Sequence, residues 1–99
     1  MTNVRLYLDK EDALHCAEVF NECGTFYTIV EVGTDYIIEY DEDTANVSWQ
    51  VCMDIMGSTL TGKIYNTYLE AYNASMGILK AHRENNIRDS RVYLEPKKR

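Results

Sequence analysis

The sequence predicts an α+β fold: a mainly antiparallel sheet with two helices packed on one face, in the order β-α-β-β-β-α-β. Three observations predict it. Strand-like segments lie between two helical segments, each helix has its own start signal, and one strand alternates cleanly between apolar and polar residues. A ferredoxin-like arrangement with one added strand is the topology we expect first. The length of 99 residues indicates one domain over 1–96, followed by a basic tail over 97–99.

The first strand and the first helix follow one another directly. Val4–Leu8 reads as a strand, and Asp9 is a suitable N-cap for the helix after it, with Asp12 three places on. Gly24 is the expected end of this helix. Apolar residues recur at helical spacing and should form the core face: Ala13, Cys16, Ala17, Phe20 and Cys23.

A β-hairpin is expected around Gly33-Thr34, between strands over 25–32 and 35–40. Its register has two alternatives. A two-residue loop suits Gly33 in a type II′ turn but places Asp35 opposite Val32. A three-residue loop places the apolar residues of both strands on one face. Because register follows the buried face, we favour the three-residue loop. That choice groups six residues: Phe26, Val30, Val32, Tyr36, Ile38 and Tyr40.

The clearest strand covers 47–54, where an apolar set alternates with a polar one. We expect Trp49 to be buried near Phe20 and Ile78, and Cys52 to lie on the solvent-facing side. Residues 57–66 are expected to form a loop, with a short strand over 63–65.

The second helix is predicted to begin at the capping box Thr67-x-x-Glu70 and to end at Asn85-Asn86. A last strand over 91–95 should stop at Pro96. The core face of the helix contains small residues that allow close packing: Ala71, Ala74, Ser75, Ile78, Leu79 and His82.

Composition favours an ordinary cytoplasmic protein. The apolar fraction is 45% and the charged fraction is 26%. No apolar run approaches the roughly 18 residues that span a membrane, and the N-terminus has no apolar secretory segment. The three cysteines contain no C-x-x-C pair, so reduced thiols are expected.

The segment "GSTLTGKI" (57–64) resembles a phosphate-binding loop except at its last position. There Ile64 replaces the Ser or Thr whose hydroxyl holds Mg²⁺. The next helix starts only at Thr67, and the preceding strand alternates as a half-exposed antiparallel strand does. We therefore interpret the segment as a connection that does not bind nucleotides.

The candidate metal and catalytic patterns are incomplete. An EF-hand counted from Asp41 would have Ala45, Asn46 and Cys52 at three required positions. His15 lies among glutamates on the first helix, but the sequence places no second His or Cys beside it. No Ser-His-Asp order or G-x-S-x-G motif is present. We expect a non-enzymatic protein with no cofactor, no metal and no catalytic residue.

Charge is distributed unevenly along the chain. Residues 1–56 contain 12 acidic and 2 basic residues, whereas residues 57–99 contain 4 acidic and 8 basic residues. The chain also contains 8 tyrosines, a residue favoured at protein interfaces. A nucleic-acid-binding sheet would need a basic face, so direct nucleic-acid binding is not expected. The predicted partner-binding residues are Glu11, Glu18, Glu22, Glu31, Tyr36, Glu39, Asp41, Glu42 and Asp43.

In general character the chain resembles the small acidic inhibitors that phages encode against host nucleases and defence systems, including anti-CRISPR proteins. The resemblance rests on small size, the segment Asp9 to Asp12, the stripe of Glu11, Glu18 and Glu22, the segment "YDED" (40–43) and the lack of a catalytic motif. It implies an inhibitor that docks on a basic, nucleic-acid-binding protein. The alternative is a self-associating assembly subunit whose Tyr-rich sheet edge pairs with itself, so either a monomer or a homodimer is compatible with the sequence. An enzyme acting on a small ligand ranks third.

Overall fold

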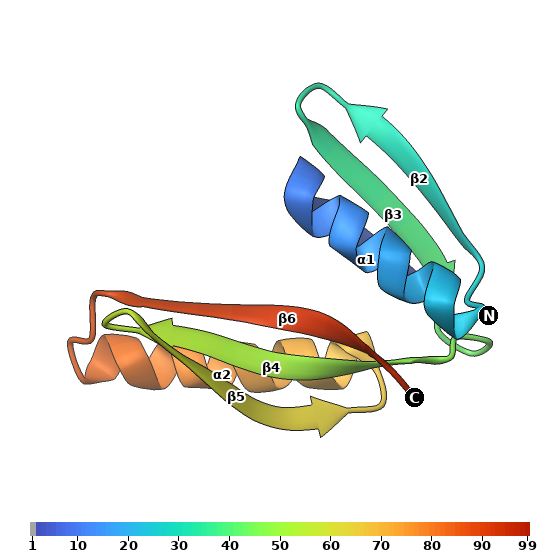
Figure 1. The fold of residues 1–99 in the computed structure, drawn as a ribbon. Coiled ribbons are helices and arrows are strands. Elements are labelled where there is room, and N and C mark those ends of the chain that lie inside the picture. The colour runs from blue at the N-terminus through green and yellow to red at the C-terminus, as the bar shows by residue number, and fades with distance from the viewer. Residues whose placement is uncertain (1) are drawn as a thin grey trace. The chain divides into compact units, whose positions relative to one another are not determined.

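The computed structural model describes residues 2–99 and is an α+β fold with two helices and two three-stranded antiparallel sheets (Figure 1). The elements in chain order are β1 (Asn3–Leu8), α1 (Lys10–Cys23), β2 (Tyr27–Val32), β3 (Asp35–Asp41), β4 (Val47–Ile55), β5 (Ser58–Tyr65), α2 (Tyr68–Glu84) and β6 (Ser90–Lys98).

The chain forms two compact units, and each contains one sheet and one helix. The first unit is Met1–Val47 with Pro96–Arg99, and the second is Ser48–Glu95. The strand order is β1-β3-β2 in one sheet and β5-β4-β6 in the other. The expected single sheet with both helices on one face is therefore wrong, as is the expected count of strands, since β5 adds one.

The helix of the first unit begins and ends at the predicted residues. The Asp9 carboxylate accepts a hydrogen bond from the Asp12 N–H at 2.8 Å, as an N-cap does. Gly24 ends α1 in the left-handed conformation, with φ of 69°. α1 contacts β1 and β3 and covers one face of this sheet, the helix-side face.

The core of the first unit is aromatic. Phe20 is fully buried, and its ring meets the rings of Tyr27 at 5.6 Å and Tyr40 at 4.9 Å in edge-to-face geometry. Ile38 and Leu6 lie opposite one another on the helix-side face, and both are buried. The predicted core positions of α1 are confirmed for Ala13, Cys16 and Phe20, which are all buried.

The β2–β3 hairpin has the two-residue loop, so the register that we favoured from the sequence is wrong. Val32 lies opposite Asp35, and Gly33 has φ of 63°, as a type II′ turn requires at its first central position. Val30 therefore lies opposite Ile37 and not opposite Ile38. The turn geometry takes precedence over apolar matching here, and it places valines on the side of the sheet away from α1, the outer face.

In the second unit, β5 replaces the loop that was expected over 57–66. Met56 and Gly57 both have positive φ, so β4 and β5 are joined by a two-residue turn of type I′. The register shifts between Gln50 and Cys52. Gly62 lies at this irregularity, and a Cβ there would approach the Val51 carbonyl oxygen to 3.0 Å. Any larger residue at Gly62 would therefore press against the β4 backbone, which glycine avoids.

The predicted capping box of α2 is confirmed. The Glu70 N–H donates to the Thr67 hydroxyl oxygen at 3.2 Å, and that hydroxyl donates to the Glu70 carboxylate at 3.0 Å. Tyr68 packs edge-to-face on Trp49 at 5.0 Å between ring centroids. Trp49 is buried, as the sequence predicts. The six residues that were predicted to form the core face of α2 are all buried or half-buried.

Three details of the last strands differ from the sequence-based expectation. β6 continues through Pro96 to Lys98, because β6 is at the edge of its sheet and a proline there removes no ladder bond. Cys52 is buried, because β4 is the central strand and both of its faces are partly covered. Arg99, expected in a basic tail outside the domain, donates from Nη1 to the Ala45 carbonyl oxygen at 3.1 Å.

Neither helix of the described residues has both the length and the apolar character of a membrane-crossing segment.

Candidate protein-docking surface

All of the net charge imbalance belongs to the first unit. Its residues include 11 acidic and 5 basic side chains, whereas the second unit has 5 of each. The net charge of the whole chain, −6, is therefore the net charge of the first unit. The first unit is therefore the candidate for charge-driven docking.

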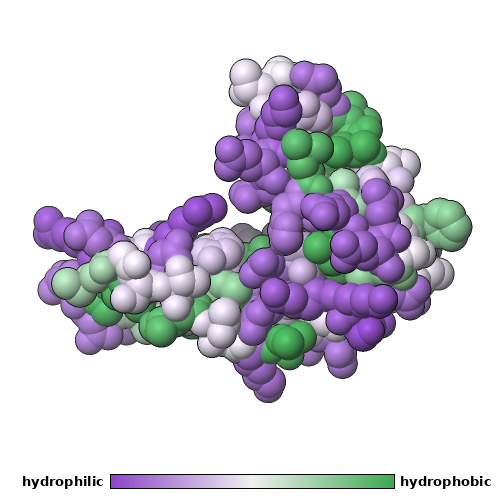
Figure 2. Space-filling view, viewed as in Figure 1, coloured by the Kyte–Doolittle hydropathy of each residue, from purple (hydrophilic) through white to green (hydrophobic). Residues whose placement is uncertain are grey.

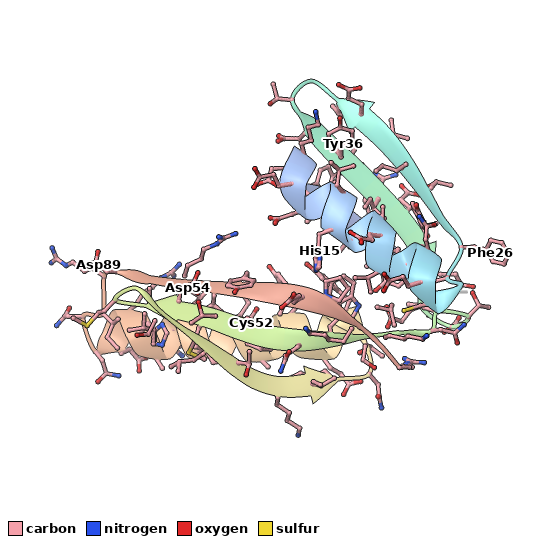
Figure 3. All side chains as sticks on the ribbon, viewed as in Figure 1. His15, Phe26, Tyr36, Cys52, Asp54 and Asp89 are labelled. Atoms are coloured by element: carbon pink, nitrogen blue, oxygen red, sulfur yellow. The ribbon has the colours of Figure 1, made fainter. Side chains whose placement is uncertain are left out.

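The solvent side of α1 brings three of the predicted residues together. Glu11, Glu18 and Glu22 are exposed and lie along one stripe of the helix. The last turn of α1 contains no basic residue. His15 is exposed on the same stripe (Figure 3). This side of the helix therefore presents carboxylates over about three turns.

An apolar residue that the sequence analysis did not single out lies within this stripe. The side chain of Leu14 is 57% exposed. It follows Glu11 by three positions and precedes Glu18 by four, so the two carboxylates flank it along the helix surface. We call Glu11, Leu14, His15, Glu18 and Glu22 the α1 face. The sequence could have identified Leu14 as an exposed apolar residue, because it lies outside the helical stripe of Ala13, Cys16 and Phe20.

Other predicted residues lie on the sheet. Glu39 lies on the outer face and forms an ion pair with Arg5, its cross-strand neighbour. Hydrogen bonding to Arg5 holds the pKa of the Glu39 carboxyl below its ordinary value. Glu31 and Tyr36 lie opposite one another on the helix-side face, at the hairpin end of the sheet. Glu39 is thus already neutralised by a partner within the chain, and it offers less charge to a basic protein than its sequence position suggests.

The acidic turn after β3 has mainly structural roles. The Asp41 carboxylate accepts hydrogen bonds from the N–H groups of Thr2 and Asp43, both at 3.1 Å. Glu42 is buried, and one of its carboxylate oxygens accepts from the Tyr40 hydroxyl at 2.7 Å. Its other oxygen has no hydrogen-bond partner among the described residues. Of the three acidic residues, Asp43 is the exposed one, so the prediction of Glu42 as a surface contact is wrong.

The predicted residues therefore do not form one surface. The glutamates of the α1 face point to solvent from the helix, whereas Glu39 lies on the opposite side of the sheet that α1 covers. A partner that contacts one set leaves the other exposed. The α1 face is the larger group of exposed carboxylates without a structural role.

The outer face of the first sheet is partly apolar. Arg5, Thr28, Val30, Ile37 and Glu39 line a shallow hollow of about 270 Å³ on it. Tyr7, opposite Ile37, is 69% exposed, which makes it the most exposed tyrosine among the described residues. Figure 2 shows apolar side chains in green along the β2–β3 hairpin, next to the purple side chains over α1.

Cys16 and Cys23 are consistent with the core roles that the sequence predicts, whereas Cys52 is buried although its alternating strand predicted solvent exposure. Cys16 and Cys52 are buried and Cys23 is half-buried, and all three are free thiols. Burial raises the pKa of the Cys16 thiol to about 12, and the nearby Asp12 carboxylate contributes further. A thiol that remains protonated is a poor nucleophile. Within residues 2–99, no group of three or more His, Cys, Asp and Glu side chains is arranged to hold a metal ion.

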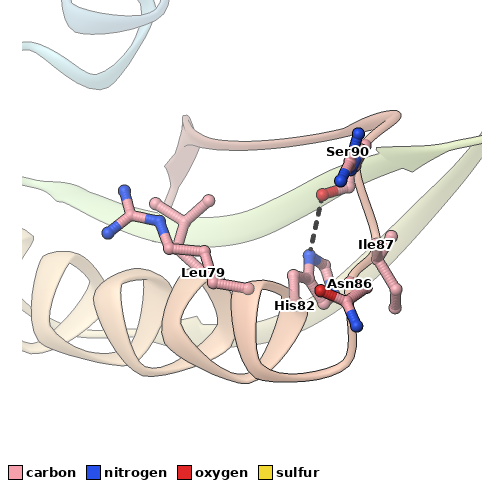
Figure 4. A pocket seen from close by; sticks show the side chains of 7 residues that line it. Leu79, His82, Asn86, Ile87 and Ser90 are labelled. Atoms are coloured by element: carbon pink, nitrogen blue, oxygen red, sulfur yellow. Dashed lines mark hydrogen bonds between the residues drawn. The ribbon is translucent and has the colours of Figure 1, made fainter.

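A pocket of about 390 Å³ lies at the C-terminal end of α2 (Figure 4). His82 Nδ1 and the Ser90 hydroxyl are 3.0 Å apart there, and Leu79 and Ile87 supply apolar walls. Arg83 and Arg88 also line the pocket. The carbonyl end of a helix disfavours an anion beside it, so this arrangement lacks the electrostatics of a phosphate site.

The "GSTLTGKI" segment has none of the geometry of a phosphate-binding loop. It forms the β4–β5 turn and strand β5, and both strands of this hairpin are antiparallel. Lys63 lies in β5, and its ammonium group stacks over the Tyr65 ring at 5.3 Å. No helix begins at Lys63, so there is no helix N-terminus to hold phosphates.

Comparison with protein-family models gives no match, and comparisons with curated proteins and with solved structures give none either. A functional interpretation therefore has to come from the geometry and charge of the surface itself.

Proposed function

We propose that this chain is a non-enzymatic binding protein that docks through the α1 face onto a basic, nucleic-acid-binding protein and inhibits it. The observation that carries the proposal is the exposed Leu14 between carboxylates on a helix of the acidic unit. An apolar contact surrounded by a charged rim is typical of protein interfaces.

The chemistry of the partner follows from this charge. A surface of lysines and arginines complements the α1 face, and such surfaces commonly bind the phosphates of nucleic acid. A protein bound there would exclude nucleic acid by occupying the same cations. Inhibition by occupation of these cations requires no catalytic step.

Association should slow as salt is added, because exposed charges are screened beyond about 8 Å at physiological ionic strength. The test variant is the double charge reversal Glu18→Lys and Glu22→Lys. Both residues are exposed, and neither makes a cap of α1. We expect at least about a tenfold loss of affinity, or about 1.4 kcal/mol.

A matched control separates the α1 face from net charge. Glu84→Lys with Asp89→Lys changes the net charge equally, and both residues are exposed in the second unit. Partners are first captured from a cell lysate on the immobilised wild-type protein and identified by mass spectrometry. Binding of the purified partner is then measured for all three proteins. Equal affinity of the wild type and the α1 variant would contradict the proposal.

A further inference from the structure

Strand β2 is an edge strand with unusually little protection. It is at one end of the order β1-β3-β2, so one side of its backbone pairs with no strand among the described residues. Its sequence "YTIVEV" has no Lys, Arg or Pro, and its pairing with β3 is regular over six residues. Natural edge strands are normally blunted by such residues or by bulges.

The other exposed edges have this protection. β5 contains Lys63 and the irregularity at Gly62, and β6 contains Pro96 with Lys97 and Lys98. β1 has its helix-side face covered by α1 and carries Arg5 on its outer face. The β2 edge is therefore the one most suited to pair with another strand.

Apolar side chains are exposed on both faces of β2. Ile29 is 42% exposed on the helix-side face, and Val30 and Val32 are 56% and 52% exposed on the outer face. Phe26, just before the strand, is 92% exposed and projects away from the sheet (Figure 3).

The two-residue turn determines which backbone groups of β2 face outward. The closing pair Val32–Asp35 is hydrogen-bonded in such a turn, so Val32, and with it Val30 and Thr28, directs its N–H and C=O groups towards β3. Tyr27, Ile29 and Glu31 then direct theirs away from the sheet. These three residues form a row of donors and acceptors at the free edge.

We infer that two copies of this chain pair through β2, antiparallel, to form a continuous six-stranded sheet with a twofold axis at Ile29. A twofold axis that makes edge strands antiparallel is perpendicular to the sheet, so the helix-side faces of both copies lie on the same side. One residue must then lie opposite its own copy.

Side-chain chemistry selects Ile29 as that residue. With Ile29 opposite Ile29 of the second copy, Glu31 lies opposite Tyr27, and Val32 lies opposite Phe26. Apolar residues thus meet apolar ones, and the carboxylate meets a phenol that can donate to it. A shift of the axis to Val30 would place Glu31 opposite Ile29, an unfavourable pair. In the Ile29 register no two like charges are directly opposed.

The inference is independent of the proposed basic partner, because it uses the free edge of β2 and none of the residues of the α1 face. It also has the opposite salt dependence. Two units of net charge −6 repel one another, so added salt should strengthen the dimer, whereas it weakens docking on a basic protein. In the dimer both α1 helices lie on one side of the sheet, so two α1 faces are presented together.

Sedimentation equilibrium between about 10 and 500 μM tests the inference, since small interfaces associate in this range. We expect a reversible dimer whose dissociation constant rises at least about tenfold in Ile29→Lys. Ile64→Lys, on edge strand β5 and with similar exposure at 52%, should leave it unchanged. If Ile29→Lys loses its circular dichroism, Ile29→Thr replaces it, since a β-branched residue keeps the strand propensity.

Cysteine crosslinking tests the register in a Cys23→Ser background. Ile29→Cys should form a disulfide-linked dimer under mild oxidation, because directly opposed residues lie about 5.5 Å apart, within the span of a disulfide. Val30→Cys, one residue away, should not. A monomer at every concentration, equal effects of Ile29→Lys and Ile64→Lys, or crosslinking through Val30→Cys in place of Ile29→Cys would each overturn the inference.

Discussion

Phe20→Ala tests the core of the first unit. Phe20 is fully buried and loses two edge-to-face contacts, with Tyr27 and Tyr40, when its ring is removed. Truncation of a buried Phe costs about 3–5 kcal/mol, and each aromatic pair contributes about 0.5–1.5 kcal/mol beyond area burial. We therefore expect a loss in the upper part of the 3–5 kcal/mol range. Small domains have only about 5–15 kcal/mol of stability, so the variant should be close to unfolded.

The assay is urea unfolding followed by far-UV circular dichroism, with the fluorescence of Trp49 as a second probe. Trp49 lies in the second unit, so coincidence of the two transitions shows whether both units unfold together. Leu14→Ala is the matched control on the same helix. Leu14 is mostly exposed, and its truncation should cost less than about 1 kcal/mol. A Phe20→Ala loss below about 1 kcal/mol, or equal losses in both variants, would refute this description of the core.

The remaining predictions concern the second unit and the buried thiol. Trp49→Ala should cost about 3–5 kcal/mol in urea unfolding, because Trp49 is buried against Tyr68; a loss below about 1 kcal/mol would contradict this packing. Calorimetry with ATP or GTP and Mg²⁺ should show no binding below millimolar concentration, since Ile64 lies where the metal-binding hydroxyl is needed; micromolar binding lost in Lys63→Ala would contradict this. The pKa of Cys16 is raised from 9.0 to about 12, so the folded state retains this proton longer than the unfolded state does. The stability that the protonated thiol provides is complete below pH 9.0 and is lost as the pH rises towards 12. The fall in the urea midpoint above pH 9.0 should therefore be smaller in Cys16→Ala than in the wild type. An equal fall in both proteins would refute the raised pKa of Cys16.

The sequence predicts the helices well because their signals are local. Asp9 and Gly24 begin and end α1 through contacts within one turn of the helix, and Thr67 with Glu70 does the same for α2. Such caps depend little on the rest of the fold. Burial of Trp49 was predictable for a similar reason, since its strand alternates.

The sheets are less predictable because strand pairing depends on distant residues. The Val32–Asp35 register contradicts apolar matching, because the two-residue turn at Gly33 decides it. β5 was missed because every residue from Ser58 to Ile64 is exposed, which leaves no apolar–polar alternation to detect. Two sheets of three strands cannot be distinguished from one larger sheet by the order of elements alone.

The candidate surface was predictable in part. The acidic stripe of Glu11, Glu18 and Glu22 follows from helical spacing, and the structure places these residues together. The burial of Glu42 depends on its bond to Tyr40, and a run of acidic residues does not reveal which member is turned inward. The exposed apolar side chains of β2 could not be predicted once the three-residue hairpin loop was favoured, because that register places the valines on the core face.

The central claim is that the α1 face and nucleic acid compete for one basic surface of the partner. Fluorescence polarisation of a labelled nucleic acid bound to the purified partner tests it most directly. The wild type and the Glu84→Lys, Asp89→Lys control should displace the nucleic acid at equal concentrations, and Glu18→Lys with Glu22→Lys should require at least about tenfold more protein. A ternary complex, in which the partner binds nucleic acid and this protein at the same time with undiminished polarisation, would contradict the account.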